Sequence, residues 1–221
     1  MASATAVAVT PRKIFSAKYV VWIVYAVLTV IVIWGRDLSL LDPNSFLRQR
    51  YAPIPWFMFL HGIPGVVALV LGVFQFSNRL RAKYIQMHRV MGRIYVGSVF
   101  IAAPLGIVVA LKLPTPTFLG VATLHATGWL LTTATALYCV KVGKIQQHKE
   151  WMIRSYPLAM AFIVARAVLL IPAVERAGLY GSIASVWWVI AAACFLPSFV
   201  IEWQKLMQKK PVNVVRAVAG D

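Results

Sequence analysis

Acidic residues are scarce in this chain, which has six Asp and Glu against 22 Lys and Arg in 221 residues. They are too few, and too far from the centres of the apolar stretches, to form a carboxylate pair for acid–base catalysis in a core. The chain also lacks a glycine-rich phosphate loop, a metalloprotease histidine pair and a nucleophile elbow. These absences exclude several common enzyme classes and leave enzymatic activity an open question.

Cysteine is also rare, with only Cys139 and Cys194 in the sequence. Both lie inside apolar stretches, so we expect no disulfide framework. Each is expected to be a small, buried and chemically inert side chain.

Apolar residues are abundant, at 61% of the sequence, while charged residues make up 13%. A soluble domain of this size would expose too much hydrocarbon, so we predict an integral membrane protein in contact with the lipid bilayer. The net charge of +16 does not indicate nucleic-acid binding. The basic residues lie between long apolar runs, where they act as topological anchors.

Six apolar stretches approach the roughly 20 residues that a helix needs to cross a bilayer. Because backbone polar groups in lipid must be paired within the segment, all six are predicted to be helices. The first follows Arg12, Lys13 and Lys18 but lacks a small-residue cleavage site, so we interpret it as an uncleaved span. The predicted spans are residues 18–35, 55–76, 93–112, 118–140, 154–174 and 182–203.

Basic residues are distributed unequally between the two sets of connections. The two tails, together with Lys18 at the start of the first span, and the connections 77–93 and 141–154 hold 16 Lys and Arg, whereas the alternate connections hold five. The positive-inside rule therefore places both tails, 1–17 and 204–221, in the cytoplasm, with the protein in a bacterial inner membrane. The predicted fold class is an all-α bundle, one membrane domain over residues 1–221 with six transmembrane helices and a duplicated four-helix core at 55–174.

Two histidines lie within apolar stretches, where imidazoles are rare and usually functional. His61 follows Pro55 by six residues and His125 follows Phe118 by seven, which places both roughly 9–10 Å below the outer surface. Arg166 lies about 12 Å below the same surface on the fifth span. These three residues are predicted to form an outer layer around a common cavity.

Each of these histidines is followed by a second one in a basic stretch, His88 after 27 residues and His148 after 23. The two halves continue to a tyrosine in each case, which indicates an internal duplication about an axis normal to the membrane. Chance similarity between apolar segments of restricted composition is the alternative. His88 and His148 lie near the cytoplasmic surface and define an inner layer.

Two neutral imidazoles that face each other across a helix bundle can supply both axial ligands of a haem iron. We therefore predict haem b bound by His61 and His125, with Arg166 neutralising a propionate. Two alternatives stay open: each histidine makes a helix-to-helix hydrogen bond, or the pair has a proton or substrate role. For Arg166 the alternative is an interfacial position beside Glu175 or a lipid phosphate.

The inner pair, His88 and His148, is a candidate for a second haem. This would require the third and fifth helices to begin early and to project beyond the hydrocarbon. The alternative is contact with lipid head groups, because the pair lies within a dense rim of basic residues. The residues predicted at the lipid interface are Arg89, Arg93, Arg154, Tyr95 and Tyr156.

Three groups of residues carry a resemblance to a known family. They are His61, Gly65, Gly72, Gln75 and Phe76; then Leu80, Arg81, His88, Arg89, Gly92, Arg93 and Tyr95; and finally His148, Trp151, Met152, Arg154, Ser155 and Arg166. The pattern is similar to that of an uncharacterised bacterial membrane family, domain of unknown function 2306 (DUF2306), over about residues 55 to 172. The resemblance implies a multi-helix membrane protein whose activity is not established. The role predicted for His125 is not part of this pattern and depends on the repeat.

The four histidines on the second to fifth helices also resemble the cytochrome b561 group in their architecture. That resemblance implies two b-type haems and transmembrane electron transfer. We therefore predict a b-type cytochrome-like electron-transfer protein with a redox protein or a quinone as its partner, and no nucleic acid. The alternatives are a binding or transport protein for a small anionic or amphipathic ligand, and a structural subunit of a membrane complex. A homodimer is compatible with each of them.

Overall fold

The computed structural model describes residues 17–35, 37–45, 48–49, 54–112 and 116–207. These residues form helices and connecting turns, and none of those described lies in a β-strand. The prediction of an all-α protein is therefore confirmed. Most of the two predicted tails, 1–17 and 204–221, lies outside the described residues. The chain divides into two compact units, residues 1–49 and 50–221.

The first unit contains the helix α1 (Ala17–Gly35) and the short 3-10 helix η1 (Asp37–Leu41). After Lys18, α1 carries no charged side chain. A helix that is apolar on all of its faces is suited to lipid or to a protein interior rather than to water.

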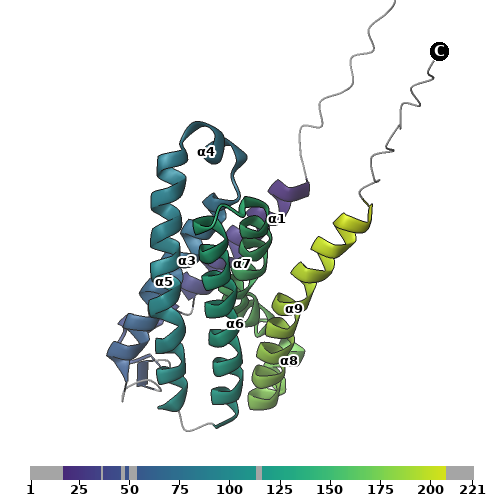
Figure 1. Cartoon of the computed structure of the whole chain (residues 1–221). Helices are drawn as coiled ribbons and strands as arrows, with labels where there is room; N and C mark the ends of the chain where they lie inside the picture. Colours follow the sequence, from purple (N-terminus) through teal and green to yellow (C-terminus); the bar gives the residue numbers. More distant parts are fainter. Residues whose placement is uncertain (1–16, 36, 46–47, 50–53, 113–115, 208–221) are drawn as a thin grey trace, which may run out of the picture. The chain divides into compact units, whose positions relative to one another are not determined.

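The second unit is built from long helices that pack in sequence order. The helix α3 contacts α5 and α7, α6 contacts the same two helices, and α9 contacts α7 and α6. Figure 1 shows α5 and α6 running side by side along this unit. Its elements are α3 (Pro55–Gln75), α4 (Asn78–Lys83), α5 (Ile85–Leu111), α6 (Pro116–Lys141), α7 (Ile145–Val168), α8 (Pro172–Arg176) and α9 (Gly178–Met207).

Two tight connections position the inner ends of α5 and α7. Ser77 caps α4, because its Oγ accepts a hydrogen bond of 3.2 Å from the backbone N–H of Leu80. Gly143, with a φ of +77°, terminates α6 in the left-handed conformation that favours glycine. The backbone N–H of Lys144 then donates to the Cys139 carbonyl at 2.8 Å. As a result, α4 and α7 begin directly after these turns, and α5 follows α4 after Tyr84.

The third and fifth helices begin earlier than predicted. We predicted spans at 93–112 and 154–174, whereas α5 begins at Ile85 and α7 extends from Ile145 to Val168. Hydropathy excluded the basic residues at both starts, but Lys, Arg, Gln and Glu are good helix formers. The early starts place His88 and His148 inside the first turns of α5 and α7. An inner haem site requires this early start, and it also requires that the two helices project beyond the hydrocarbon.

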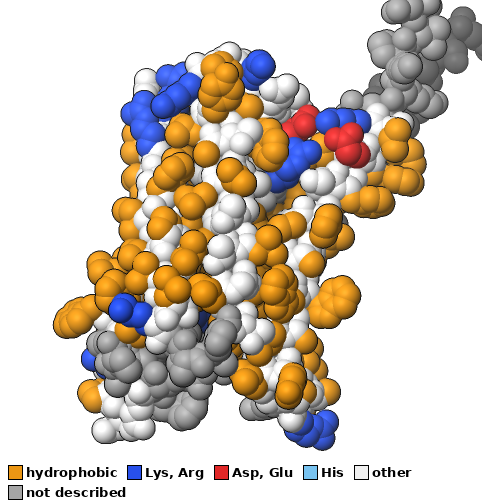
Figure 2. Space-filling model, turned by 60° about the horizontal axis from the view of Figure 1, so that its bottom comes forward, with side chains coloured by type: hydrophobic (Ala, Val, Ile, Leu, Met, Phe, Trp, Pro, Cys, Tyr) orange, Lys and Arg blue, Asp and Glu red, His pale blue; other side chains and the backbone are white. Residues whose placement is uncertain are grey.

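Several helices are apolar enough to cross a membrane. Among the described residues, four stretches meet both the length and the composition of a span, and α6 and α7 are not among them. The four are Trp22–Leu41, Trp56–Gln75, Ile85–Leu111 and Gly178–Met207. Figure 2 shows apolar side chains over most of the visible face of the second unit, with basic side chains near the end that carries α4. The chain is thus a multi-pass membrane protein.

Candidate functional site

The two outer histidines each bind a backbone carbonyl of a neighbouring helix. His61 on α3 places its Nδ1 2.8 Å from the Ala102 oxygen on α5. His125 on α6 places its Nε2 2.8 Å from the Leu158 oxygen on α7. In each half of the proposed repeat, a ring N–H therefore donates to the next long helix. This is the hydrogen-bonded arrangement that the sequence left open as an alternative to haem ligation.

Phe162 on α7 brings the outer residues together. Its ring meets the His61 ring edge-on at 5.8 Å between centroids and the His125 ring at 4.8 Å. Arg166 lies one turn further along α7 and acts electrostatically on His61. The structure thus brings the two outer histidines against one aromatic side chain that sequence reasoning missed, with Arg166 near enough to act on His61. Phe162 occupies one position in a long apolar run, which gives no signal of this role.

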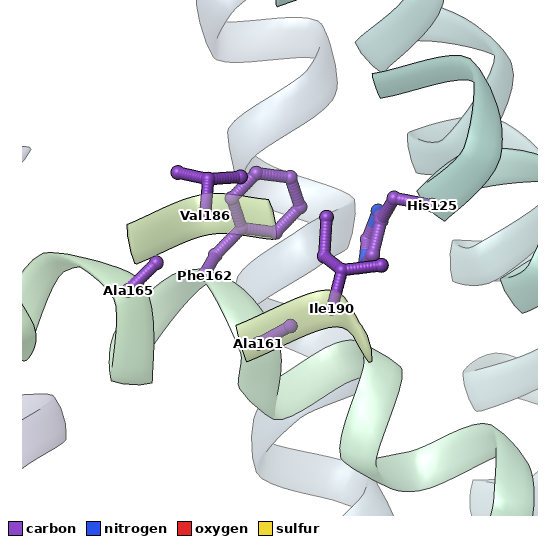
Figure 3. A pocket seen from close by; sticks show the side chains of 6 residues that line it. All are labelled: His125, Ala161, Phe162, Ala165, Val186 and Ile190. Carbon is purple, nitrogen blue, oxygen red and sulfur yellow. The ribbon is translucent and has the colours of Figure 1, made fainter. Parts of the chain in front are cut away.

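The outer cluster leaves little space for a ligand. Figure 3 shows a cavity beside His125 and Phe162, which is completed by residues of α7 and α9. The cavity measures about 10 Å³, which is the space that a single water needs. A Cβ atom at Gly106 would lie 3.1 Å from the His61 ring, so that ring is also closely packed. Both outer rings are therefore closely packed by their neighbours.

A buried polar network lies between the outer and inner layers. The Tyr95 hydroxyl on α5 is 2.8 Å from the Ser155 Oγ and accepts a hydrogen bond of 3.3 Å from the Trp129 Nε1. The Thr133 hydroxyl completes the network at 2.7 Å from the Ser155 Oγ. The Trp129 ring also contacts the His125 ring at 5.8 Å. These bonds join α5, α6 and α7 in the middle of the second unit.

Tyr95 and Tyr156 do not lie where we predicted them. We expected both in an interfacial belt, but Tyr95 is 0% exposed and Tyr156 is 2% exposed. The Tyr156 hydroxyl donates to the Leu69 carbonyl of α3 at 2.9 Å. Both hydroxyls have partners inside the bundle, which allows these side chains to be buried. Hydropathy locates a residue along a helix but does not show which side faces the neighbouring helices.

The inner histidines have a different environment from the outer pair. His148 on α7 donates from its Nδ1 to the Ala136 carbonyl of α6 at 2.8 Å. The Nδ1 of His88 on α5 is buried and has no hydrogen-bond partner among the described residues. The two rings also interact electrostatically. The inner end thus contains one buried polar atom that is unsatisfied among the described residues.

Gln75 provides a second unsatisfied atom at the inner end. It is the last residue of α3 and is 6% exposed, and its buried Nε2 has no partner in the part of the chain that the structure describes. Its Oε1 lies 3.2 Å from the position of a Cβ at Gly92, one turn after His88 on α5. Its backbone carbonyl accepts a hydrogen bond of 3.1 Å from Arg81. The sequence pattern contained Gln75 but indicated no role for it.

The predicted interfacial arginines divide into two groups. Arg89 and Arg93 are exposed, as a lipid contact requires, and their binding to lipid stays a prediction. Arg154 instead donates from its Nε to the Ser198 Oγ of α9 at 3.1 Å. Its guanidinium also lies 5.0 Å from the Trp151 ring centroid. Arg154 therefore joins α7 to α9.

Two further expectations concern groups at the site. The Glu175 side chain, the alternative partner of Arg166, lies outside the described residues. Within the described ranges, no cluster of three or more His, Cys, Asp or Glu side chains can hold a metal ion. A haem iron needs only two axial ligands from the protein, so a pair of histidines is sufficient for that group.

Comparison with known proteins identifies a family but no characterised relative. The sequence model of the predicted membrane protein family DUF2306 matches residues 58–204. The match therefore extends through most of α9, beyond residue 172, where the resemblance in the sequence ended. No curated protein and no solved structure matches the chain.

Proposed function

This chain belongs to the predicted membrane protein family DUF2306, and we propose that it is a b-type cytochrome-like electron-transfer protein. In this proposal, His88 and His148 are the axial ligands of a haem b at the inner end of the second unit. The observation that supports it best is the buried and unpartnered Nδ1 of His88, on a ring that interacts electrostatically with His148.

The hydrogen bond of His148 suits it to be a ligand. Because its Nδ1–H donates to the Ala136 carbonyl, its Nε2 carries the ring's lone pair. A backbone carbonyl that fixes the tautomer and orientation of a ligating histidine is a common feature of metal sites. A bound haem would supply a one-electron redox couple. His148 therefore has the lone pair that an axial ligand needs.

His88 also lacks what a purely structural histidine normally has. A buried polar atom without a hydrogen-bond partner costs about 1–3 kcal/mol, and native structures contain few of them. His61, His125 and His148 all donate to carbonyls. His88 is the exception among the four, and ligation of a metal through its Nδ1 would give that buried atom a partner.

The outer histidines support a structural role more than a second haem. Phe162 packs against both rings, and each ring donates to a carbonyl of the next long helix. His61 bonds through its Nδ1, as His148 does, so its Nε2 likewise carries the ring's lone pair. In His125 the bonded atom is Nε2, so the ring's lone pair lies on Nδ1. Haem ligation by His61 and His125, with Arg166 near a propionate, stays a prediction that the experiment below also tests.

The membrane arrangement is part of the proposal. We infer that α1, α3, α5, α6, α7 and α9 all cross the bilayer, with α3, α5, α6 and α7 as a four-helix core. The 16 basic residues of the tails and of two connections then face the cytoplasm of a bacterial inner membrane. The inner histidines lie on that side, where a redox protein or a quinone would exchange electrons with the site.

Haem content of the purified protein tests this function. We expect a reduced-minus-oxidised spectrum with a b-type band for the unaltered protein, and loss of that band in His88→Ala and in His148→Ala. His61→Ala and His125→Ala are the matched controls and should retain it. Loss of the band only in these two variants would indicate that the haem is bound by the outer pair, His61 and His125.

A colourless protein under haem-replete expression would refute the proposal. In that case, stabilisation of the protein against heating by a small carboxylate would favour the binding or transport alternative. Co-purification of a stoichiometric membrane partner would favour the structural-subunit alternative.

A further inference from the structure

We infer that the Gln75 carboxamide, with Arg81 beside it, binds an acidic group of the ligand in the inner site; for a haem this group is a propionate. The inference rests on the proposed function and deepens it. It assigns a chemical role to a residue that neither histidine pair explains.

Gln75 has a buried hydrogen-bond donor that is unsatisfied in the described part of the chain. Gln75 is more than nine-tenths buried, and its Nε2 makes no hydrogen bond within the described ranges. An amide N–H group that is buried in a bundle requires an acceptor, because it has lost its water. Among the side-chain atoms described in the second unit, only the Gln75 Nε2 and the His88 Nδ1 are buried without a hydrogen-bond partner. Both atoms therefore call for a ligand in the same region.

The position of Gln75 also brings its side chain close to α5. The Gln75 carboxamide lies against Gly92, and Gly92 follows His88 by one helical turn on the same face of α5. Glycine at this position leaves room for the carboxamide, because a Cβ would lie only 3.2 Å from its Oε1. The donor of α3 thus reaches the face of α5 that carries the proposed ligand, His88.

Positive charge also surrounds His88. Arg81 and Arg89 both act electrostatically on His88. Arg81 is held in place by the Gln75 carbonyl and the Asn78 side chain. The acidic group described on α7 at this end, Glu150, is paired with Arg154 and Lys205. The inner site therefore has an excess of positive charge, which favours an anionic group on the ligand.

Comparison of two haem compounds tests this inference. Full-length protein from haem-deficient cells would be titrated with haemin and with haemin dimethyl ester, in which both propionates are uncharged. We expect the unaltered protein to bind haemin about tenfold more tightly than the ester, because charge-assisted hydrogen bonds are lost with the ester. In Gln75→Leu this preference should fall to about twofold or less, while the ester binds as before.

Two variants complete the test. Gln86→Leu removes an exposed glutamine of α5 and is the matched control that should keep the full preference. Gln75→Glu keeps the size of the side chain and adds a negative charge, so it should reverse the preference toward the ester. If Gln75→Leu does not fold, Gln75→Glu alone tests the inference.

The outcomes separate this inference from the proposed function. If the unaltered protein binds neither compound, both are wrong. If it binds haemin and the ester equally, or if Gln75→Leu and Gln75→Glu both keep the full preference, the site holds a haem but Gln75 does not bind its acidic group.

Discussion

The Tyr156 ring of α7 lies directly over Gly72 of α3, so that a Cβ atom at residue 72 would overlap the ring. The Tyr156 hydroxyl then donates to the Leu69 carbonyl on the same helix, at 2.9 Å. The absence of a side chain at residue 72 thus allows the two helices to meet closely. This contact holds α3 against α7 between the outer and the inner histidines.

Gly72→Ala is therefore expected to destabilise the protein. Overpacking of a close helix crossing typically costs about 1–3 kcal/mol, and the free energy of unfolding in mixed detergent micelles would measure it. Gly65→Ala in the same helix is the matched control, because nothing lies within 4 Å of a Cβ there. Equal stability of the two variants would show that α3 and α7 do not cross at Gly72.

Tyr95→Phe should also lower the free energy of unfolding, by about 1–3 kcal/mol. The variant removes the hydroxyl that contacts the Ser155 Oγ and the Trp129 Nε1, and the indole N–H is then buried without an acceptor. Tyr138→Phe on α6 is the control, because Tyr138 is 62% exposed and should tolerate the change. A fully stable Tyr95→Phe protein would contradict the buried network.

The side of the membrane can be tested with single cysteines. In a variant without Cys139 and Cys194, Arg79→Cys should react with an impermeant thiol reagent only after the cells are opened. Lys112→Cys, at the other end of α5, should react in intact cells. The expectation follows from the excess of basic residues at the end that carries α4. The reverse pattern would place the inner histidines on the outer side of the membrane and the outer histidines on the cytoplasmic side.

The sequence was sufficient to predict the all-α fold and the approximate position of the long helices. Long apolar runs bounded by proline and glycine give unambiguous helices in a membrane protein, and α3 ends within one residue of its predicted end. The fixed helical rise then places His61, His125 and Arg166 at similar depths. In the structure the rings of His61 and His125 both pack against Phe162, and Arg166 acts electrostatically on His61.

Two features were not predictable in this way. Hydropathy averages over all faces of a helix, so it could not show that Tyr95 and Tyr156 face the interior and Phe162 separates the outer rings. It also excluded the basic stretches before residues 93 and 154, although they are helical. The role of Gln75 became visible only when its amide could be checked for a partner.

The spin state of the ferric protein tests the central claim most directly. Low-temperature electron paramagnetic resonance of the unaltered protein should show a low-spin signal typical of two imidazole ligands. In His148→Ala this signal should disappear or become high-spin, whereas in His125→Ala it should be unchanged. A low-spin signal that survives in His148→Ala and is lost in His125→Ala would contradict an inner haem, and a protein without any haem signal would contradict the electron-transfer function itself.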